Sequence, residues 1–323
     1  MNFSPTHQLH TSRMDEEQFQ ALTQQIDARL SAGEHLTGED VVQMNGGGTY
    51  DTMVSILSQR GIEHAKAKDY NRRLAAACRG GYVGKWKAGC SLLALARDGG
   101  FSPCQLARRM LEQLLSEPTK QDLKWAMRDP GRLPSTRLRD EVAECVAADQ
   151  LQGPRVDVIK QITGEEFEYI LGEILTNAGV PFLTEDDLRN KGNAKTPDVK
   201  LEVPLLIDGH VVQWIDSKAK FGDLSTFKAE AEGQFRSYIN RYGPGLVVYW
   251  CGFVTDLCDE DATFADGTPV VQPDVHVMAK LDHVSLMGMP QQSTTRRLNL
   301  MDIATPSKNG YGGGGGLSRS ETF

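Results

Sequence analysis

Hydrophobic residues follow two different patterns along the chain, and the change falls near Gly153-Pro154. Before it, apolar residues recur three and four positions apart, which is the period of amphipathic helices. We expect helices over residues 14–30, 50–59, 66–79 and 138–148, separated by breaks rich in glycine or proline. After it, helical stretches alternate with short strand-like runs. The sequence therefore predicts an all-helical domain over 14–150 and an α/β (α+β) domain over 151–285.

Two helical segments of the first half are joined by a short glycine turn. The leucine-rich segment ends at Asp98-Gly99-Gly100, after which Ser102 can cap the next helix and Pro103 suits its first turn. A helix, a glycine turn and a basic helix are typical of a helix-turn-helix unit. We expect nucleic-acid contacts from Gln105, Arg108 and Arg109. The alternative is a small helical bundle in which this pair only packs.

The second half begins with an apolar stripe that predicts one long helix. Thr163 and Glu166 have the spacing of a capping box, and the stripe runs from Phe167 to Ala178 before Gly179 ends it. We expect strands at 180–183, 246–250 and 275–281, a hairpin at 196–218 and a further helix at 225–242.

The hairpin joins Thr196-Pro197-Asp198 to Asp216-Ser217-Lys218 through an Asp208-Gly209 turn. Strand alternation places Asp216 and Lys218 on one face, and the register decides whether Asp198 joins them. A two-residue loop would set residue 199 opposite 218 and turn Asp198 away. A three-residue loop or a bulge would set 198 opposite 218, so a functional site predicts one of these irregularities. The alternative is a polar edge that faces solvent.

Two carboxylates and a lysine at such a site suit the attack of water on a phosphodiester. Asp oxygens suit Mg²⁺, which takes few protein ligands and keeps several waters. The ion polarises the phosphate and acidifies a bound water, while a lysine can orient that water or offset charge. Glu168 lies at the border of the apolar stripe, so it is the candidate for a third inward carboxylate, with an exposed glutamate as the alternative.

The distribution of charge changes the picture of the helical half. A net charge of −8 does not by itself suggest a nucleic-acid binder. However, Arg60–Arg139 contains 17 Lys/Arg and 7 Asp/Glu, a balance of +10, while the rest of the chain carries −18. A basic block in an acidic chain is a candidate phosphate-contacting surface, and an ordinary solvated helical surface is the alternative.

Composition argues against a membrane protein or a disulfide scaffold. No apolar run approaches the roughly 18 residues that a membrane span needs, and the first residues lack the apolar core of a secretory signal. The six cysteines form no Cys-x-x-Cys pair, which favours reduced thiols in an intracellular protein. We expect residues 1–13 to be disordered and 286–323, with their glycine-rich run, to be a flexible tail.

Several of these motifs together resemble a known nuclease family. Pro197-Asp198 followed by Asp216-Ser217-Lys218 is similar to the PD-(D/E)xK motif. Gly164 and Glu168 are similar to the first-helix acid of that superfamily, and Gln234 and Tyr238 to the Gln-x-x-x-Tyr of its exonuclease branch. The runs EDDLRNKG, KTPD, WIDSKAKFGD and RYGPGLVVYWCGF resemble the codanin-interacting nuclease family, which is also known for its Thr-Pro-Asp motif. The segment LARDGGFSPCQLARRMLEQLL resembles it more loosely.

The resemblance implies a helical DNA-binding domain followed by a restriction-endonuclease-like core, a mixed sheet flanked by helices. It implies that Mg²⁺ or Mn²⁺ is held by Asp198, Asp216, the Ser217 carbonyl and Glu168, with Lys218 assisting the water and hydrolysis leaving a 5′-phosphate. Asp216 stands where glutamate is commoner in the PD-(D/E)xK motif, which allows either acid, and its shorter arm puts the metal affinity in question. The resemblance also implies a codanin-like partner and a nuclear location, with the cytoplasm as the alternative.

Three functions fit these expectations. The first is an active nuclease, with DNA as the expected substrate, in which Lys220 lines the substrate path or is simply solvated. The second is a nuclease fold with little or no catalysis that binds a codanin-like partner. The third is a DNA-binding regulator that works through Arg108 and Arg109, which would leave the carboxylates of the second half without a role.

Overall fold

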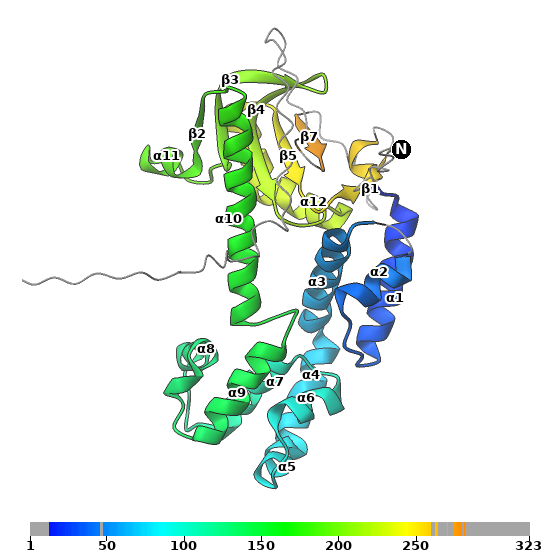
Figure 1. The fold of residues 1–323 in the computed structure, drawn as a ribbon, viewed down its shortest axis with the longest axis vertical. Helices are drawn as coiled ribbons and strands as arrows, with labels where there is room; N and C mark the ends of the chain where they lie inside the picture. The colour runs from blue at the N-terminus through cyan, green and yellow to red at the C-terminus, as the bar shows by residue number, and fades with distance from the viewer. Residues whose placement is uncertain are drawn as a thin grey trace, which may run out of the picture. The chain divides into compact units, whose positions relative to one another are not determined.

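The computed structural model describes residues 13–45, 48–259, 262–263, 270, 274–279 and 281. Within them, a helical N-terminal region precedes a five-stranded mixed sheet flanked by helices (Figure 1). The fold class predicted from the sequence is therefore confirmed. The flexible tail predicted for 286–323 lies outside the described residues, as does all of the predicted disordered start except Arg13. No helix among the described residues is long and apolar enough to cross a membrane.

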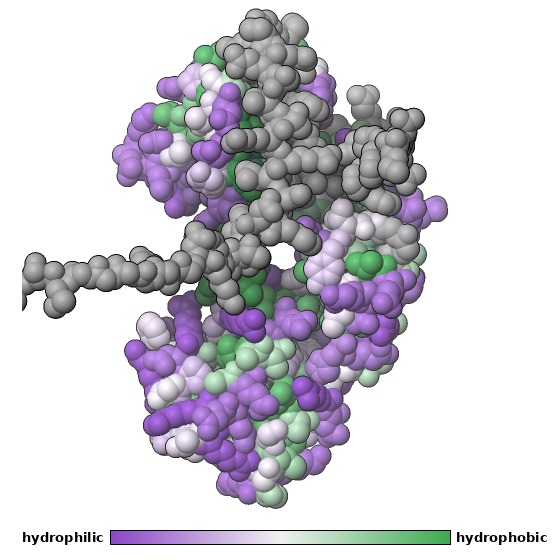
Figure 2. All heavy atoms as spheres, in the orientation of Figure 1, coloured by the Kyte–Doolittle hydropathy of each residue, from purple (hydrophilic) through white to green (hydrophobic). Residues whose placement is uncertain are grey.

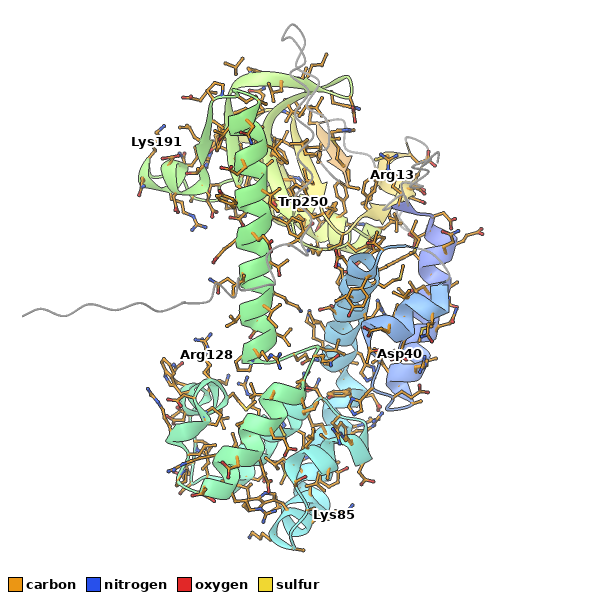
Figure 3. The ribbon with its side chains drawn as sticks, viewed as in Figure 1. Arg13, Asp40, Lys85, Arg128, Lys191 and Trp250 are labelled. Carbon is orange, nitrogen blue, oxygen red and sulfur yellow. The ribbon has the colours of Figure 1, made fainter. Side chains whose placement is uncertain are left out.

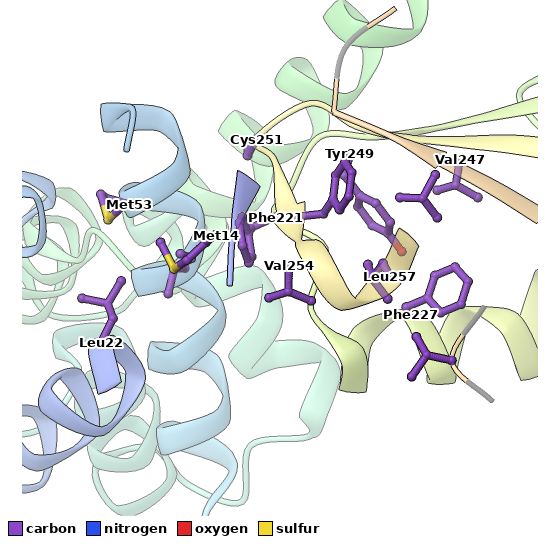
Figure 4. Close-up of a cluster of buried hydrophobic side chains, with 14 of the residues drawn as sticks. Met14, Leu22, Met53, Phe221, Phe227, Val247, Tyr249, Cys251, Val254 and Leu257 are labelled. Atoms are coloured by element: carbon purple, nitrogen blue, oxygen red, sulfur yellow. The ribbon is translucent and has the colours of Figure 1, made fainter. Parts of the chain in front are cut away.

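The first three helices are α1 (Glu16–Ser31), α2 (Gly38–Asn45) and α3 (Tyr50–Lys66). Asp15 caps α1 by accepting the Gln18 N–H at 2.7 Å, and the helix buries Leu22, Ile26 and Leu30. These helices do not form a core of their own, because their buried residues join one cluster with residues 214–277 of the second half. Figure 4 shows Met14, Leu22 and Met53 as members of this cluster.

Hydrogen bonds also join α3 to the second half of the chain. The Thr52 hydroxyl donates to the Cys251 carbonyl at 2.8 Å, and the Gln59 amide donates to the Phe221 carbonyl at 2.9 Å. The Phe221 N–H in turn donates to the Ser55 hydroxyl at 2.8 Å. The helices up to α3 thus support the sheet, and the domain limits of 14–150 and 151–285 stay predictions.

A second helical group has its own core, built from buried residues between Ala65 and Cys145. Its elements are α4 (Lys68–Ala77), the π-turn η1 (Cys78–Tyr82), α5 (Val83–Lys87), α6 (Leu92–Gly99), α7 (Pro103–Leu114), α8 (Lys120–Arg128), the 3-10 turn η2 (Pro130–Arg132) and α9 (Thr136–Ala148). The visible surface of this group is largely hydrophilic (Figure 2).

The turn between α6 and α7 forms as the sequence predicts. α6 ends at Gly100, whose left-handed backbone (φ 63°) suits glycine, and the Ser102 hydroxyl accepts the Gln105 N–H at 3.2 Å. Pro103 occupies the first turn of α7, where its missing N–H costs no hydrogen bond.

The long helix α10 (Pro154–Asn177) begins earlier than predicted. The proposed capping box at Thr163 is wrong, because Thr163 lies inside the helix. The actual start is Gly153, with φ 103°, followed by Pro154, whose fixed φ suits a first helical position. The predicted end is confirmed, since Gly179 adopts a left-handed φ of 70° just beyond the helix.

The sheet has the order β2 (Phe182–Thr184), β3 (Val199–Ile207), β4 (His210–Lys218), β5 (Gly245–Tyr249) and β7 (Val275–Met278). β2, β3 and β4 are antiparallel neighbours, whereas β4, β5 and β7 run parallel. A small separate pair joins β1 (Arg13–Met14) to β6 (Phe253–Val254), which the 3-10 turn η4 (Thr255–Cys258) follows.

Helices cover both faces of the sheet, and β5 shows how. Leu246 and Val248 pack in one cluster with Leu171 and Leu175 of α10, while Val247 and Tyr249 belong to the other cluster. Alternate residues of a strand point to opposite faces, so a strand that is buried throughout needs a cover on each side. The second cover is one helical stretch made of α12 (Leu224–Glu230), the π-turn η3 (Ala231–Phe235) and α13 (Arg236–Tyr242). A short helix, α11 (Glu185–Asn190), follows β2.

Candidate active site

The β3–β4 hairpin contains the irregularity that the sequence analysis requires. Its turn is a two-residue loop in which Ile207 faces His210, with φ of 47° at Asp208 and 84° at Gly209, so the three-residue loop is wrong. The predicted bulge is confirmed: the register shifts between Lys200 and Leu205, where residues 201–204 face only residue 213.

The bulge determines which acids meet. Because Val199 pairs with Ile215, the next position sets Asp198 opposite Asp216 rather than opposite Lys218. Asp198 Oδ2 accepts the Ser217 N–H at 2.6 Å, which holds its carboxylate against the end of β4. The bulge also leaves Val203 exposed, although simple alternation would bury it. The two motif acids therefore lie together, in a register different from the one predicted.

The two carboxylates share a buried environment that disfavours their ionised forms. Burial and the neighbouring Asp216 raise the pKa of Asp198 to about 8. Burial also raises the pKa of Asp216, which is only 1% exposed. Asp216 Oδ2 contacts the Lys218 ammonium as an ion pair. Two negative charges in one desolvated place repel each other, so this site gains from an added cation.

Lys218 lies between a carboxylate and an amide. Its ammonium contacts Asp216 and donates to Gln234 Oε1 at 3.2 Å. Burial lowers the pKa of Lys218, but the carboxylates of Asp216, Glu230 and Asp198 together outweigh burial, so the net pKa lies above the usual value and the side chain stays charged. Gln234 lies in the π-turn η3, and such single π-turns within helices often occur at functional sites.

Tyr238, one of the predicted catalytic residues, occupies a supporting position. Its buried hydroxyl donates to the Thr196 carbonyl at 2.9 Å, which ties α13 to the Thr-Pro-Asp segment. This contact helps to position Asp198, and the catalytic role of Tyr238 stays a prediction.

Glu168 is an exposed residue of α10, yet a carboxylate of the same site acts on its pKa. Partial desolvation, then the Glu185 and Asp216 carboxylates, raise the pKa of Glu168. Glu185 and Glu230 are acids that the sequence analysis missed. Glu185 accepts the Thr196 hydroxyl at 3.1 Å, and Glu230 pairs with Lys220 at 2.6 Å while accepting the Tyr249 hydroxyl at 2.6 Å. The signal for Glu230 was its position four residues before Gln234.

A divalent cation fits the donors at this site. In the described part of the chain, no group of three or more His, Cys, Asp or Glu side chains is arranged to hold a metal ion. Mg²⁺ needs less, because it binds through one or two carboxylates and fills its other positions with water and phosphate oxygens. The pair Asp198 and Asp216, two buried carboxylates whose pKa values are raised by burial, meets that requirement.

An aromatic pair lies next to the motif. The Trp250 ring stacks on Phe167 of α10 at 4.9 Å between centroids, and its indole N–H donates to the Ser217 hydroxyl at 2.8 Å. Figure 3 shows Trp250 between α10 and the sheet. Its backbone N–H also donates to the Lys218 carbonyl at 3.0 Å. Trp250 thus connects α10, β5 and the end of β4.

The residues predicted to contact nucleic acid lie in different surroundings. Gln105 donates to Gln152 at 2.5 Å, Arg109 pairs with Glu112 at 2.7 Å, and Lys220 pairs with Glu230 at 2.6 Å. Only Arg108 is exposed without a partner among the described residues. The helix α7 that carries three of them buries six of its residues, Pro103, Cys104, Leu106, Ala107, Met110 and Leu111. The helix pair therefore forms, and its role as a DNA reader stays a prediction.

Comparisons with known proteins agree with the motif. The family described as "Protein of unknown function TPD sequence-motif" matches residues 134–268. CDAN1-interacting nuclease 1 of Mus musculus is 40% identical over 64% of this chain and 77% of its own length, and the Homo sapiens protein gives the same figures. The Xenopus laevis protein of that name is 46% identical over 55% of this chain and 61% of its own. No solved structure matches.

Proposed function

The chain belongs to the family of CDAN1-interacting nuclease 1, and we propose that it is a metal-dependent nuclease that hydrolyses phosphodiester bonds, with DNA as the expected substrate. The observation that carries the proposal is the meeting of Asp198, Asp216 and Lys218 at the bulged end of the hairpin. The name of the relatives supports a nuclease, and the buried, paired acids support the part played by the metal.

We infer that Asp198, Asp216 and the Ser217 carbonyl would hold Mg²⁺ or Mn²⁺, with Glu168 at the edge of the site. When bound, the ion supplies Lewis acidity and lowers the pKa of a coordinated water. The Ser217 N–H keeps the Asp198 carboxylate in place, so the site is formed before any ligand enters. A preformed site avoids the loss of free energy that ordering these side chains would cause.

Lys218 has the properties of a group that acts on the phosphate or the water. Its raised pKa keeps it cationic at neutral pH, and Asp216 and Gln234 fix its position from two sides. A fixed ammonium in a desolvated site stabilises the negative charge that develops on a phosphate during hydrolysis. Its neighbour Lys220 is neutralised by Glu230, so we assign the chemistry to Lys218.

The test is cleavage of a panel of labelled single-stranded, double-stranded and branched DNA and RNA with Mg²⁺, Mn²⁺ or a chelator. We expect cleavage only with metal, and a loss of at least about 10³-fold in Asp216→Asn, which keeps the side-chain volume. Asp186→Asn, an exposed acid on α11, is the matched control and is expected to cleave normally. Undiminished cleavage by Asp216→Asn would remove the basis of the proposal.

The relatives' name also supports a second function, the binding of a codanin-like protein. Val158, Ile159 and Ile162 on α10 are exposed apolar residues, which mark protein interaction sites when they gather on one surface. A capture assay with a purified codanin-like protein tests this idea. Ile162→Asp should lose the partner while Gln161→Asp, next to it on α10, keeps it. Equal capture by both variants would leave α10 without this role.

A further inference from the structure

A row of exposed cations runs along one side of helix α8. Lys120, Lys124 and Arg128 are spaced four residues apart, so they share one side of the helix and succeed one another by about 6 Å along its axis. All three are exposed, and the described residues offer none of them an ion-pair partner. Figure 3 shows Arg128 at the end of α8, projecting from the ribbon. We call these three residues the α8 cations.

A tryptophan stands beside this row. Trp125 is 43% exposed, which is unusual for so large an apolar ring, and helical geometry sets it about 60° from Arg128 around the axis. The Arg132 guanidinium lies over the ring, 5.2 Å from its centroid, and is itself held by Asp129 at 2.9 Å. The ring is therefore fixed from one side while much of its surface stays open to solvent.

Packing explains the apolar side of α8 but not the side that carries the cations and Trp125. Leu123, Ala126 and Met127 are buried in the core of the second helical group and are enough to attach the helix. The acid Asp122 belongs to the capping box with Thr119, whose hydroxyl lies 2.6 Å from its carboxylate. The α8 cations and Trp125 therefore form a surface that contributes little to the packing of the fold.

The contrast with α7 is direct. On α7, Gln105 and Arg109 are engaged with Gln152 and Glu112 within the protein. On α8, three cations and an aromatic ring are presented to solvent. A surface that binds nucleic acid must offer charges that have no internal partner, because each pair within the protein has to break before a phosphate takes its place.

We propose that α8 holds a single-stranded segment of nucleic acid, with the α8 cations on its phosphates and Trp125 stacked on an unpaired base. This inference rests on the proposed nuclease function, for which it supplies a substrate-holding surface. Charge complementarity selects a polyanion, and an open aromatic ring beside the charges selects unpaired bases, since bases in a duplex already stack on one another. Arg132 contributes by keeping the ring in place.

The experiment measures binding of fluorescent 20-mer single strands, DNA and RNA, and of a duplex with the same sequence, to the whole chain in a chelator at 50 to 200 mM salt. K120Q/K124Q/R128Q removes the α8 cations, and W125A removes the ring. R29Q/K66Q/R72Q is the matched control, because it removes the same charge from three residues outside α8 that are already paired with acids. Circular dichroism and thermal melting verify that each variant is folded.

We expect the α8 triple variant to reduce the salt slope, the change in log K with log salt, by about 2 for single strands. W125A should weaken single-strand binding by on the order of tenfold and duplex binding much less. The control variant should keep the wild-type slope. Wild-type affinity and slope in the α8 triple variant would overturn the proposal, as would equal effects of W125A on single strand and duplex.

Other outcomes separate this proposal from the nuclease itself. If the wild type cleaves with metal but the α8 variants keep wild-type nucleic-acid affinity, the binding role of α8 is wrong and the nuclease proposal stands. If no substrate is cleaved but α8 changes still weaken binding, the nuclease activity fails and the binding surface stands. Loss of a protein partner with unchanged nucleic-acid affinity would make α8 a protein-binding surface and overturn the proposal.

Discussion

Charged residues are used in opposite ways at the hairpin site and on α8. At the hairpin, Asp198, Asp216 and Lys218 lie in a desolvated site, where Asp216 and Lys218 shift the pKa of Asp198 and of each other. On α8, the cations are exposed and far less constrained. Desolvation strengthens every charge interaction, so the first arrangement suits chemistry, while free charges in water suit the gathering of a long polyanion.

The largest effect is expected from two lysines that lie two residues apart. Lys218→Met should lower kcat by about 10²- to 10⁴-fold, because it removes the fixed charge beside the acids. Lys220→Met should lower it by less than about tenfold, since Lys220 is neutralised by Glu230 and its loss changes little at the reacting phosphate. Both are measured in single-turnover cleavage with saturating metal. Equal losses would mean that burial next to Asp216 does not distinguish the two side chains.

The raised pKa of Asp198 predicts a pH dependence of metal binding. Without metal, the folded chain keeps a proton on Asp198 up to a pKa of about 8, whereas the unfolded chain releases it near 3.8. This proton's stabilisation is therefore complete below about pH 4 and is lost as pH rises through about 8. A cation has to displace the proton, so Mn²⁺ affinity should rise by about tenfold per pH unit between pH 6 and 8.

Calorimetric titration with Mn²⁺ in buffers of different ionisation enthalpy measures the proton released. Asp198→Asn should bind metal more weakly and with a flatter pH dependence, and its unfolding free energy without metal should fall less than that of wild type as pH rises. A wild-type metal affinity that is constant from pH 6 to 8 would show that Asp198 is already ionised.

Features that depend on contacts between residues close in the sequence can be predicted from it, whereas features that depend on distant contacts cannot. The turn at Gly100 and the end of α10 at Gly179 obey local rules and are predicted correctly, because capping and positive φ involve neighbouring residues only. The need for a bulge follows from alternation along two strands. Its position does not follow from alternation, although Pro204, which lies in the irregular stretch and has no N–H for the ladder, is a local mark of a bulge.

In the helical half, the sequence predicts the helices but not which of their surfaces are exposed. Periodicity identifies α7 as an amphipathic helix with arginines, but not that its neighbours α6, α8 and α9 leave it little exposed surface. For the same reason, the sequence does not identify α8 as a binding surface. Its cations and Trp125 look like ordinary surface residues in sequence, and only the fold reveals that they have no partner. The start of α10 was misplaced because Thr163 and Glu166 mimic a capping box within a longer helix.

A middle-sized effect is expected on α10. Glu168→Gln should weaken metal affinity by about tenfold, because its carboxylate adds negative potential at the acids even where it does not ligate the ion directly. Glu173→Gln, an exposed acid on the same helix, should have no effect. Mn²⁺ titrations of the two variants compare them. A loss of affinity in both would indicate a general effect of the charge on α10.

The smallest effect separates the two tryptophans. Trp250→Phe keeps a ring against Phe167 but removes the hydrogen bond to the Ser217 hydroxyl, worth about 1 kcal/mol, so kcat should fall about fivefold with unchanged strand affinity. Trp125→Phe keeps the stacking surface and should leave both quantities within about twofold. Single-turnover cleavage and anisotropy measure the two quantities on the same samples. The reverse pattern, affinity lost at residue 250 and turnover lost at 125, would mean that the hairpin site gathers the strand and α8 serves the chemistry.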